Sequence, residues 1–225
     1  KERAGVPHDS IDVVGANEKF SASDYEALAR PVCERLLAEN KNPVVCGGTG
    51  FYIQSLLFSR SLGNVGASEE VRRKYERMEI ELGKEAVFAR LQAVDSESAA
   101  KLHPNDVKRV IRALEIFELT GKKKSEQEDG FVARYPYVAV AFDYPREELY
   151  ARIDARVEQM LQDGLVEEVQ KILADGTSEQ SQSMQGIGYK EVVQFLKKEI
   201  SYSTMRDVIK QNSRNYAKRQ ITFFK

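Results

Sequence analysis

The sequence Pro43-Val-Val-Cys-Gly-Gly-Thr-Gly50 contains a short apolar run that ends at a glycine-rich turn. A continuous apolar run of this length is typical of a strand that is buried on both faces of a sheet. The glycines break the run, and residues 51–58 then have the apolar spacing of a helix. Strand, glycine turn and helix in this order predict an α/β unit.

A second buried strand is predicted at Tyr137-Val-Ala-Val-Ala-Phe142, and most of the remaining chain has helical periodicity. One helical segment begins at His103-Pro-Asn-Asp106, places Val110 and Leu114 on one apolar face, and stops at Gly121. Two strands among many helices predict part of a parallel sheet with helical additions. A complete sheet cannot be built from these residues.

The composition is that of an ordinary globular protein, with 42% hydrophobic and 31% charged residues among 225. It excludes collagen-like, low-complexity and largely disordered chains. The formal net charge is -1, so a globally basic nucleic-acid-binding protein is excluded and any basic site must be local. Cys33 and Cys46 cannot form a zinc site by themselves. The uncharged stretch 42–59 is too polar and broken to span a bilayer.

The Gly47-Gly-Thr-Gly50 turn is the first candidate binding site. Glycines let backbone amides come close to a ligand, and a helix N-terminus that follows a strand favours an anion. The Thr49 hydroxyl is suited to a phosphate oxygen or a metal-bound water. A tight turn without any ligand explains the glycines equally well. The turn is not a Walker A motif, because no Lys-Ser or Lys-Thr pair follows at the required spacing.

Basic side chains gather on two predicted helices. Lys108, Arg109 and Arg112 lie opposite the apolar face of one helix, and Arg152 and Arg156 are four residues apart on the other. Planar guanidinium groups match the oxygens of a phosphate. A solvated helix face explains the same charges without a ligand.

The C-terminal segment, residues 208–225, is also basic, because it holds five lysines and arginines and no acidic residue. Its Lys210, Arg214 and Lys218 fall on one helical stripe with polar side chains between them, a pattern suited to a phosphate backbone. The alternative is an amphipathic terminal helix with a charged exterior. Together with the glycine turn, the basic groups suggest an enzyme that handles a phosphorylated donor, with a nucleic acid as a further ligand.

The chain carries distinctive motifs over almost its whole length. They are Gly5-Val-Pro-His8, Ile11-Asp12, Phe20-Ser-Ala-Ser-Asp24, Pro43-Val-Val-Cys-Gly-Gly-Thr-Gly-Phe-Tyr-Ile53, His103-Pro-Asn-Asp106, Arg109-Val-Ile-Arg-Ala-Leu-Glu115, Gln185-Gly-Ile-Gly-Tyr-Lys-Glu191 and Tyr216-Ala-Lys-Arg-Gln-Ile-Thr-Phe-Phe224. In this order they resemble the motifs of tRNA dimethylallyltransferases. The resemblance implies transfer of a dimethylallyl group from its diphosphate to N6 of the adenosine at tRNA position 37. It further implies the tRNA anticodon stem-loop and dimethylallyl diphosphate as partners, Mg²⁺ as cofactor, a monomer, and a cytoplasmic location.

The fold implied by the resemblance is α/β, with a partial P-loop kinase-like parallel sheet core and a large, mostly helical part that binds tRNA. We accordingly divide the chain into four parts. They are part of the α/β core (1–63), a helical insertion (64–132), a core strand with its connection (133–150), and a helical, basic segment that contacts tRNA and returns to the core (151–225).

The resemblance also assigns roles to single residues. Thr49 matches a family threonine at the active-site channel, and Arg112 and Arg156 match two arginines that contact the diphosphate or support catalysis; these three are the predicted catalytic residues. Diphosphate binding is expected of the same three residues together with Gly47, Gly48 and Gly50. tRNA binding is expected of Lys108, Arg109, Arg112, Gln185, Gly186, Gly188, Tyr189, Lys190, Lys218, Arg219, Gln220, Thr222 and Lys225. We expect no protein-held metal cluster.

One departure from the family pattern bears on activity. The family carries its phosphate-binding P-loop and its general-base aspartate before the Gly5-Val-Pro-His8 motif, and neither stands in these 225 residues. Asp12 and Asp24 match other family positions. We therefore expect these residues alone to be inactive. Two alternative functions stay open: a nucleotide kinase-like phosphotransferase, and a non-catalytic RNA-binding module.

Overall fold

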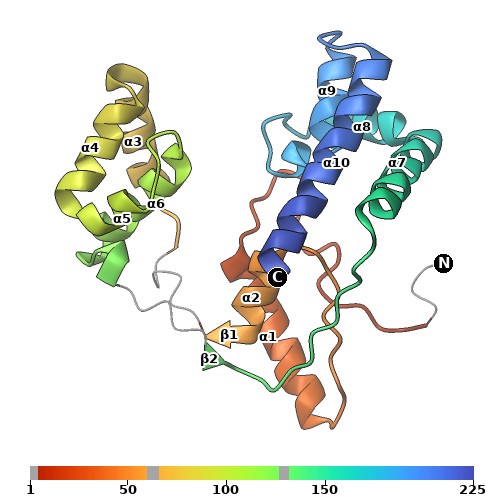
Figure 1. Cartoon of the computed structure of the whole chain (residues 1–225), viewed down its shortest axis with the longest axis horizontal. Helices are drawn as coiled ribbons and strands as arrows, with labels where there is room; N and C mark the ends of the chain where they lie inside the picture. Colours follow the sequence, from red (N-terminus) through yellow and green to blue (C-terminus); the bar gives the residue numbers. More distant parts are fainter. Residues whose placement is uncertain (1–4, 60–65, 127–131) are drawn as a thin grey trace. The chain divides into compact units, whose positions relative to one another are not determined.

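The computed structural model describes residues 5–59, 66–126 and 132–225. The chain forms two units, of which the first consists of Lys1–Leu57 with Tyr135–Lys225 and the second of Phe58–Arg134. Helices make up most of both units (Figure 1). The predicted boundary between residues 63 and 64 lies outside the described residues, and the four-part division of the chain stays a prediction.

The second unit is a group of helices that carries a two-stranded ribbon. Its elements are β1 (Phe58–Ser59), α3 (Glu69–Leu82), α4 (Lys84–Val94), α5 (Ser96–Ala100), α6 (Val107–Thr120), η1 (Lys124–Glu126) and β2 (Val132–Ala133). The two strands are antiparallel, with Phe58 opposite Ala133. The helices bury one apolar cluster, in which Tyr75, Leu91 and Leu114 are among the largest side chains.

The limits of α6 follow from its sequence. Gly121 ends the helix in the left-handed conformation, at φ 69, which costs a glycine little. Val110 and Leu114 are buried as their spacing predicts. Asp106 occupies the N-cap position without a side-chain hydrogen bond. The predicted helix is confirmed.

The first unit holds the remaining helices. They are α1 (Ala22–Ala38), α2 (Gly50–Leu57), α7 (Arg146–Gln162), α8 (Leu165–Ala174), η2 (Ser183–Gln185), α9 (Tyr189–Leu196) and α10 (Tyr202–Phe224). An apolar core around Val169, Met184 and Met205 joins α7, α8, α9 and α10. A smaller cluster around Cys33 and Leu56 joins α1 to α2. The long helix α10 contacts α7 and α9 and reaches α2 at its C-terminal end (Figure 1).

The two predicted buried strands are not formed. Residues 43–46 and 137–142 belong to no ladder, and within the described residues the sheet consists of β1 and β2 alone. Val44 is 89% exposed, Val138 92% and Phe142 86%. An apolar run becomes a strand only when neighbouring strands accept its backbone hydrogen bonds. The predicted partial parallel sheet is therefore wrong for the described residues, and a P-loop kinase-like core is not confirmed.

Candidate functional site

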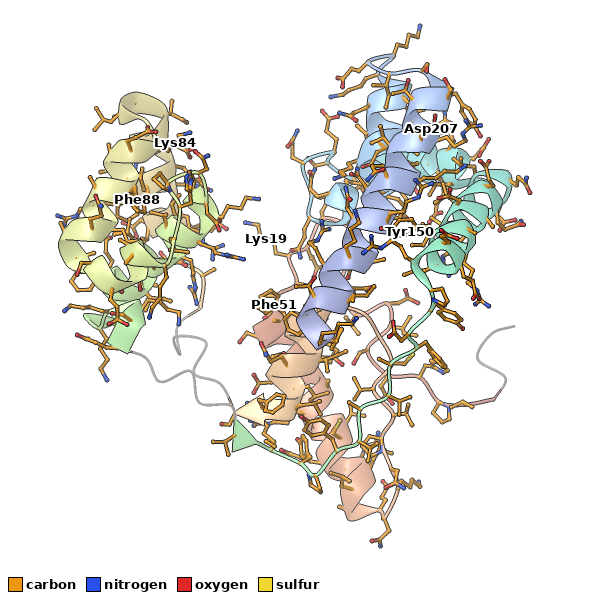
Figure 2. All side chains as sticks on the ribbon, in the orientation of Figure 1. Lys19, Phe51, Lys84, Phe88, Tyr150 and Asp207 are labelled. Carbon is orange, nitrogen blue, oxygen red and sulfur yellow. The ribbon has the colours of Figure 1, made fainter. Side chains whose placement is uncertain are left out.

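The Gly47-Gly-Thr-Gly50 turn lies against the C-terminal end of α10. The Gln220 side-chain amide donates a hydrogen bond of 3.0 Å to the carbonyl oxygen of Gly48. The hydroxyls of Thr49 and Tyr216 are 3.4 Å apart, and the rings of Phe51 and Phe223 meet edge to face with centroids 5.6 Å apart. Phe51, labelled in Figure 2, marks this junction of α2 and α10. Three contacts thus hold the turn on one helix.

Two of the turn's glycines lie where side chains of α10 come very close to the backbone. A Cβ on Gly48 would lie 1.9 Å from the Gln220 amide nitrogen, and one on Gly50 would lie 2.3 Å from the Phe223 ring. Neither glycine has a positive φ, so space and not backbone freedom selects them. A Cβ on Gly47 would meet nothing within 4 Å. The exposed Gly47 and Thr49 therefore remain the part of the turn that faces solvent.

Arg156 projects from α7 as an exposed side chain. Within the part of the chain that the structure describes, no hydrogen bond or ion pair engages it. Its neighbour Arg152, one turn earlier, bonds to Glu148 at 3.2 Å and lies over the Tyr144 ring at 4.4 Å. The two arginines of the predicted pair therefore differ, and Arg156 is the one whose charge is available to an anion.

The predicted basic stripe of α10 is largely a contact with α7. Lys210 donates a hydrogen bond of 2.5 Å to Glu158, and Arg214 forms an ion pair with Asp154 through two hydrogen bonds. These carboxylates neutralise both cations, which favours the alternative of a charged helix exterior for Lys210 and Arg214. The hydrogen bond to Asp154 is the main cause that raises the pKa of Arg214. Both basic side chains join two helices.

The cations at the C-terminal end of α10, Lys218 and Arg219, are exposed, and so is Lys225, which follows the helix. Arg219 lies over the Tyr216 ring at 5.4 Å, and the Thr222 hydroxyl donates to the Lys218 carbonyl at 3.0 Å. A cavity of about 440 Å³ is lined by Asp143, Tyr144, Arg146, Leu149, Tyr150, Lys218, Ile221, Thr222 and Lys225. Its lining holds three cations, Arg146, Lys218 and Lys225, and one carboxylate, Asp143, which makes the cavity attractive to an anion.

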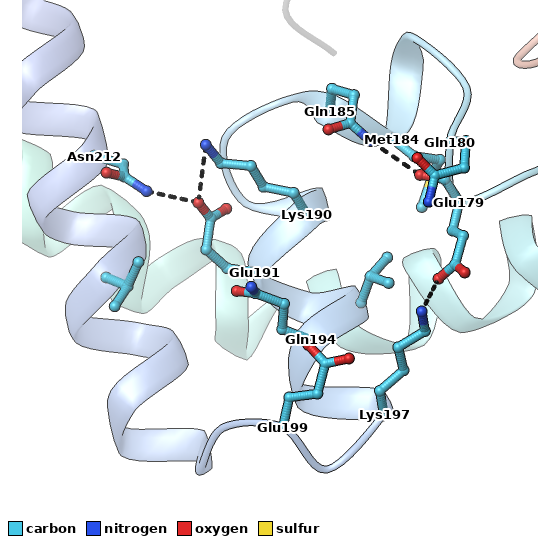
Figure 3. A pocket seen from close by; sticks show the side chains of 12 residues that line it. Glu179, Gln180, Met184, Gln185, Lys190, Glu191, Gln194, Lys197, Glu199 and Asn212 are labelled. Atoms are coloured by element: carbon cyan, nitrogen blue, oxygen red, sulfur yellow. Dashed lines mark hydrogen bonds and ion pairs between the residues drawn. The ribbon is translucent and has the colours of Figure 1, made fainter. Parts of the chain in front are cut away.

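The 185–190 turn runs from Gln185, the last residue of η2, through residues 186–188 to the first two residues of α9 (Figure 3). Gln185 donates to the Glu179 carbonyl at 3.0 Å, and Gly188 has a φ of 99, which favours glycine. The Tyr189 hydroxyl donates to Glu168 at 2.6 Å, and burial together with that carboxylate raises the Tyr189 pKa to about 12. The backbone amide of Lys190 donates a hydrogen bond of 3.2 Å to the carbonyl oxygen of Gly186.

Lys190 lies on one side of a polar cavity of about 460 Å³ (Figure 3). The cavity is lined by Glu179, Gln180, Met184, Gln185, Lys190, Glu191, Val193, Gln194, Lys197, Glu199, Val208 and Asn212. Its wall therefore combines amide, ammonium and carboxylate groups from η2, α9 and α10.

The predicted site residues of α6 belong to the second unit. Arg112 donates a hydrogen bond of 2.6 Å to Glu115, whereas Lys108 and Arg109 are exposed. Arg109 forms an ion pair with Asp106 at 3.2 Å. The structure thus assembles Thr49 and Gln220 in the first unit, and it describes Arg112 separately, within α6.

Sequence reasoning missed two residues of the first-unit site, Tyr216 as a partner of Thr49 and Asn212 as a partner of Glu191. The available signal was spacing, because Asn212, Tyr216 and Gln220 are four residues apart and so share one face of a helix.

Among residues 5–59, 66–126 and 132–225, no three His, Cys, Asp or Glu side chains are grouped as a metal site would require. In the same ranges, no helix combines the length and apolar character needed to cross a bilayer.

Comparison with known proteins assigns the family. The family model described as IPP transferase matches residues 1–225. A tRNA dimethylallyltransferase of Caldanaerobacter subterraneus is 39% identical over 230 residues, covering 100% of this chain and 73% of the relative.

Two solved structures are similar as well. The tRNA isopentenylpyrophosphate transferase of Bacillus halodurans has a TM-score of 0.68 at 37% identity, covering 99% of this chain and 70% of that one. A eukaryotic dimethylallyltransferase that acts on tRNA has a TM-score of 0.76 at 27% identity, covering 100% and 57%. These two neighbours support the predicted α/β fold class but not the predicted P-loop kinase-like core. The chain belongs to the IPP transferase family.

Proposed function

We propose that this chain transfers a dimethylallyl group from dimethylallyl diphosphate to N6 of the adenosine at tRNA position 37, giving N6-isopentenyladenosine and diphosphate. The match of the transferase family over residues 1–225 carries the proposal. The comparisons lend no support to a nucleotide kinase or to a non-catalytic RNA-binding module.

The reaction breaks the bond between the allylic carbon and the diphosphate oxygen and forms a bond from that carbon to N6. Negative charge develops on the diphosphate as it leaves, so donors placed around it lower the barrier. The exposed Thr49 hydroxyl, the Gly47 backbone and the guanidinium of Arg156 are the first-unit groups that we assign to this task. For Arg112, which lies in the second unit, diphosphate binding stays a prediction from the resemblance alone.

The N6 proton must pass to a base. We do not assign this role to Asp24, because its carboxylate accepts hydrogen bonds from the Ser21 amide at 2.8 Å and hydroxyl at 2.7 Å. These bonds lower the Asp24 pKa and tie the carboxylate to the start of α1. The resemblance also matches Asp24 to another family position, so it does not assign the base to that residue either.

Magnesium is the cofactor that the resemblance implies. The described residues do not gather the carboxylates that a protein-held Mg²⁺ site uses. No step of the proposed reaction is therefore routed through the ion.

tRNA binding is assigned to the exposed cations near the end of α10, to Lys108 and Arg109 of α6, and to the segment 185–190. Lysine and arginine that neutralise backbone phosphates give affinity that falls as salt rises. We propose a monomer as the binding form and the cytoplasm as its location, since tRNA is the acceptor.

The test is direct. The complete gene product is incubated with Mg²⁺, dimethylallyl diphosphate and a tRNA transcript with A37. The tRNA is then digested, and its nucleosides are analysed by mass spectrometry. We expect an adenosine heavier by one isopentenyl unit, and none from a matched transcript with G37, which lacks the acceptor amine. A folded preparation that binds tRNA and yields no modified adenosine would favour the RNA-binding module. ATP consumption would favour the kinase.

The same assay on the 225-residue chain addresses its activity alone. The expectation that these residues alone are inactive is not supported, because the matches extend over the whole chain.

A further inference from the structure

The buried carboxylate of Glu191 joins three parts of the first unit (Figure 3). Glu191 is 1% exposed. One of its oxygens accepts the Gly188 amide at 2.8 Å, and the other accepts the Asn212 side-chain amide at 2.7 Å. The Lys190 ammonium lies 3.5 Å from the oxygen that Asn212 also contacts. A single carboxylate therefore fixes the 185–190 turn, the Lys190 ammonium and α10.

Asn212, the partner of Glu191, lies on a face of α10 that also contacts the Gly47-Gly-Thr-Gly50 turn. Asn212, Tyr216 and Gln220 follow each other at four-residue spacing, so their side chains share that face. Tyr216 reaches Thr49, and Gln220 reaches Gly48. Asn212 and Gln220 are separated by about 12 Å of helix, at ~1.5 Å per residue. One rigid helix face contacts both turns.

We infer that Glu191 and Asn212 are positioning residues, which set the 185–190 turn and Lys190 at a fixed distance from the Gly47-Gly-Thr-Gly50 turn. The inference rests on the proposed function. tRNA held at Lys190 then presents its adenosine to a donor held at Thr49, and α10 sets the distance between the two. Placement of two reactants by a rigid element lowers the entropy that the reaction must lose.

A local role for Glu191 must be separated from this one. Glu191 is the third residue of α9, and its carboxylate accepts the backbone amide of Gly188, the N-cap residue of that helix. That bond spans three residues and does not involve Asn212. Changes at Asn212 therefore test the link to α10 and leave the cap in place.

The experiment uses four variants of the complete protein in steady-state prenylation assays, with the Michaelis constants for tRNA and for dimethylallyl diphosphate measured separately. Asn212→Asp places a second carboxylate beside Glu191, and Asn212→Ala removes the hydrogen bond without adding charge. In Glu191→Gln/Asn212→Asp, the new amide can donate to the new carboxylate and still accept the Gly188 amide. Gln211→Ala is the control, because Gln211 is exposed and bonds to Asn215 on its own helix.

We expect Asn212→Asp to raise the KM for tRNA at least about tenfold, as loss of a charge-assisted hydrogen bond does. Asn212→Ala should also raise the KM for tRNA, and Glu191→Gln/Asn212→Asp should bring it most of the way back to the wild-type value. The KM for dimethylallyl diphosphate should stay unchanged in all variants. The Gln211→Ala control has no effect.

Three results separate the possible failures. A wild-type protein that makes no isopentenyladenosine refutes the proposed function itself. An active wild type with unchanged tRNA constants in both Asn212 variants overturns the positioning role. Equal changes in the constants for tRNA and donor, in step with a lower Tm, assign the pair to stability alone. If Asn212→Asp does not fold, Asn212→Ala decides between these results.

Discussion

The guanidinium of Arg112 donates a hydrogen bond of 2.6 Å to the carboxylate of Glu115, a side chain that is fully buried. The same carboxylate accepts the Arg72 Nε atom at 2.9 Å and the Ser68 backbone amide at 2.7 Å. Two guanidinium groups therefore share one carboxylate at the junction of α3 and α6. An arginine expected to contact diphosphate is thereby oriented within its own unit.

Replacement of Glu115 by Gln should destabilise the second unit. The amide keeps the shape but removes the charge that three donors face, and hydrogen bonds to charged groups contribute about 1.5–3 kcal/mol. We expect a loss of this order in the free energy of unfolding, measured by urea denaturation at pH 7. The matched control is Glu97→Gln, because Glu97 and its partner Lys101 are both exposed and such pairs contribute little. Equal losses in both variants would contradict the expectation.

Asp95 gives the second unit a defined dependence on pH. Burial alone would raise the pKa of Asp95, but hydrogen bonds from Ser125 and Ser98 outweigh it and hold the pKa at about 2, against an ordinary value of 3.8. Because the pKa is lower in the folded than in the unfolded state, the ionised carboxylate gives its full stabilisation above pH 3.8. This contribution to the free energy of unfolding is lost as the pH falls from 3.8 towards 2.

Asp95→Asn should therefore cost about 2 kcal/mol at pH 7, from ~1.4 kcal/mol per pKa unit. The difference in unfolding free energy between wild type and variant should shrink as the pH falls through the same window. Chemical denaturation from pH 7 to pH 2 measures it. A difference that stays constant with pH would show that the carboxylate charge contributes nothing.

The glycine turn offers a comparison between neighbouring positions. Gly50→Ala would place a Cβ 2.3 Å from the Phe223 ring, whereas Gly47→Ala would meet no atom within 4 Å. Overpacking of this kind costs about 1–3 kcal/mol, so Gly50→Ala should lower the Tm and Gly47→Ala should not. Gly48→Ala should be partly rescued by Gln220→Ala, since the clash is with that side chain. Equal Tm values for Gly47→Ala and Gly50→Ala would refute the packing account.

The helices were predictable because their signals are local. In α6 the apolar spacing, the polar start at Asp106 and the stop at Gly121 all lie within the segment itself. The apolar runs 43–46 and 137–142 carry a local signal too, but a strand depends on partners elsewhere in the chain. The sequence could not show that these runs find no ladder among the described residues.

The candidate site was predictable in its residue types and not in its contacts. Gly48 and Gln220 are 172 residues apart, and only the fold brings them together. The ion pairs between α10 and α7 had a faint signal in the sequence. Lys210 and Arg214 are four residues apart on α10, and their partners Glu158 and Asp154 are four residues apart on α7. Matching acidic and basic stripes on two helices indicate an interface as readily as a nucleic-acid surface.

Arg156→Ala should impair catalysis without changing stability. The side chain is exposed, and within the described residues it has no partner to lose. If it contacts the leaving diphosphate, its removal costs about 1.5–3 kcal/mol, or ~10- to 150-fold in kcat/KM for the donor. Arg152→Ala is the control, because Arg152 already pairs with Glu148. Unchanged constants for Arg156→Ala, at an unchanged Tm, would remove Arg156 from the site.

The two kinds of basic residue on α10 should respond differently to substitution. Reversal of the exposed Lys218 and Arg219 to Glu should weaken tRNA binding and flatten its dependence on salt, since fewer counterions are released. Lys210→Met removes a cation that already pairs with Glu158, so it should lower the Tm and leave the salt slope unchanged. Filter binding between 50 and 200 mM salt measures both slopes, because several phosphate contacts together change the affinity about 10³-fold or more over this range. If the Lys218 and Arg219 reversal lowers the Tm and leaves the salt slope unaltered, that end of α10 contributes to folding and not to tRNA binding. If Lys210→Met flattens the slope, Lys210 belongs to the tRNA-binding surface.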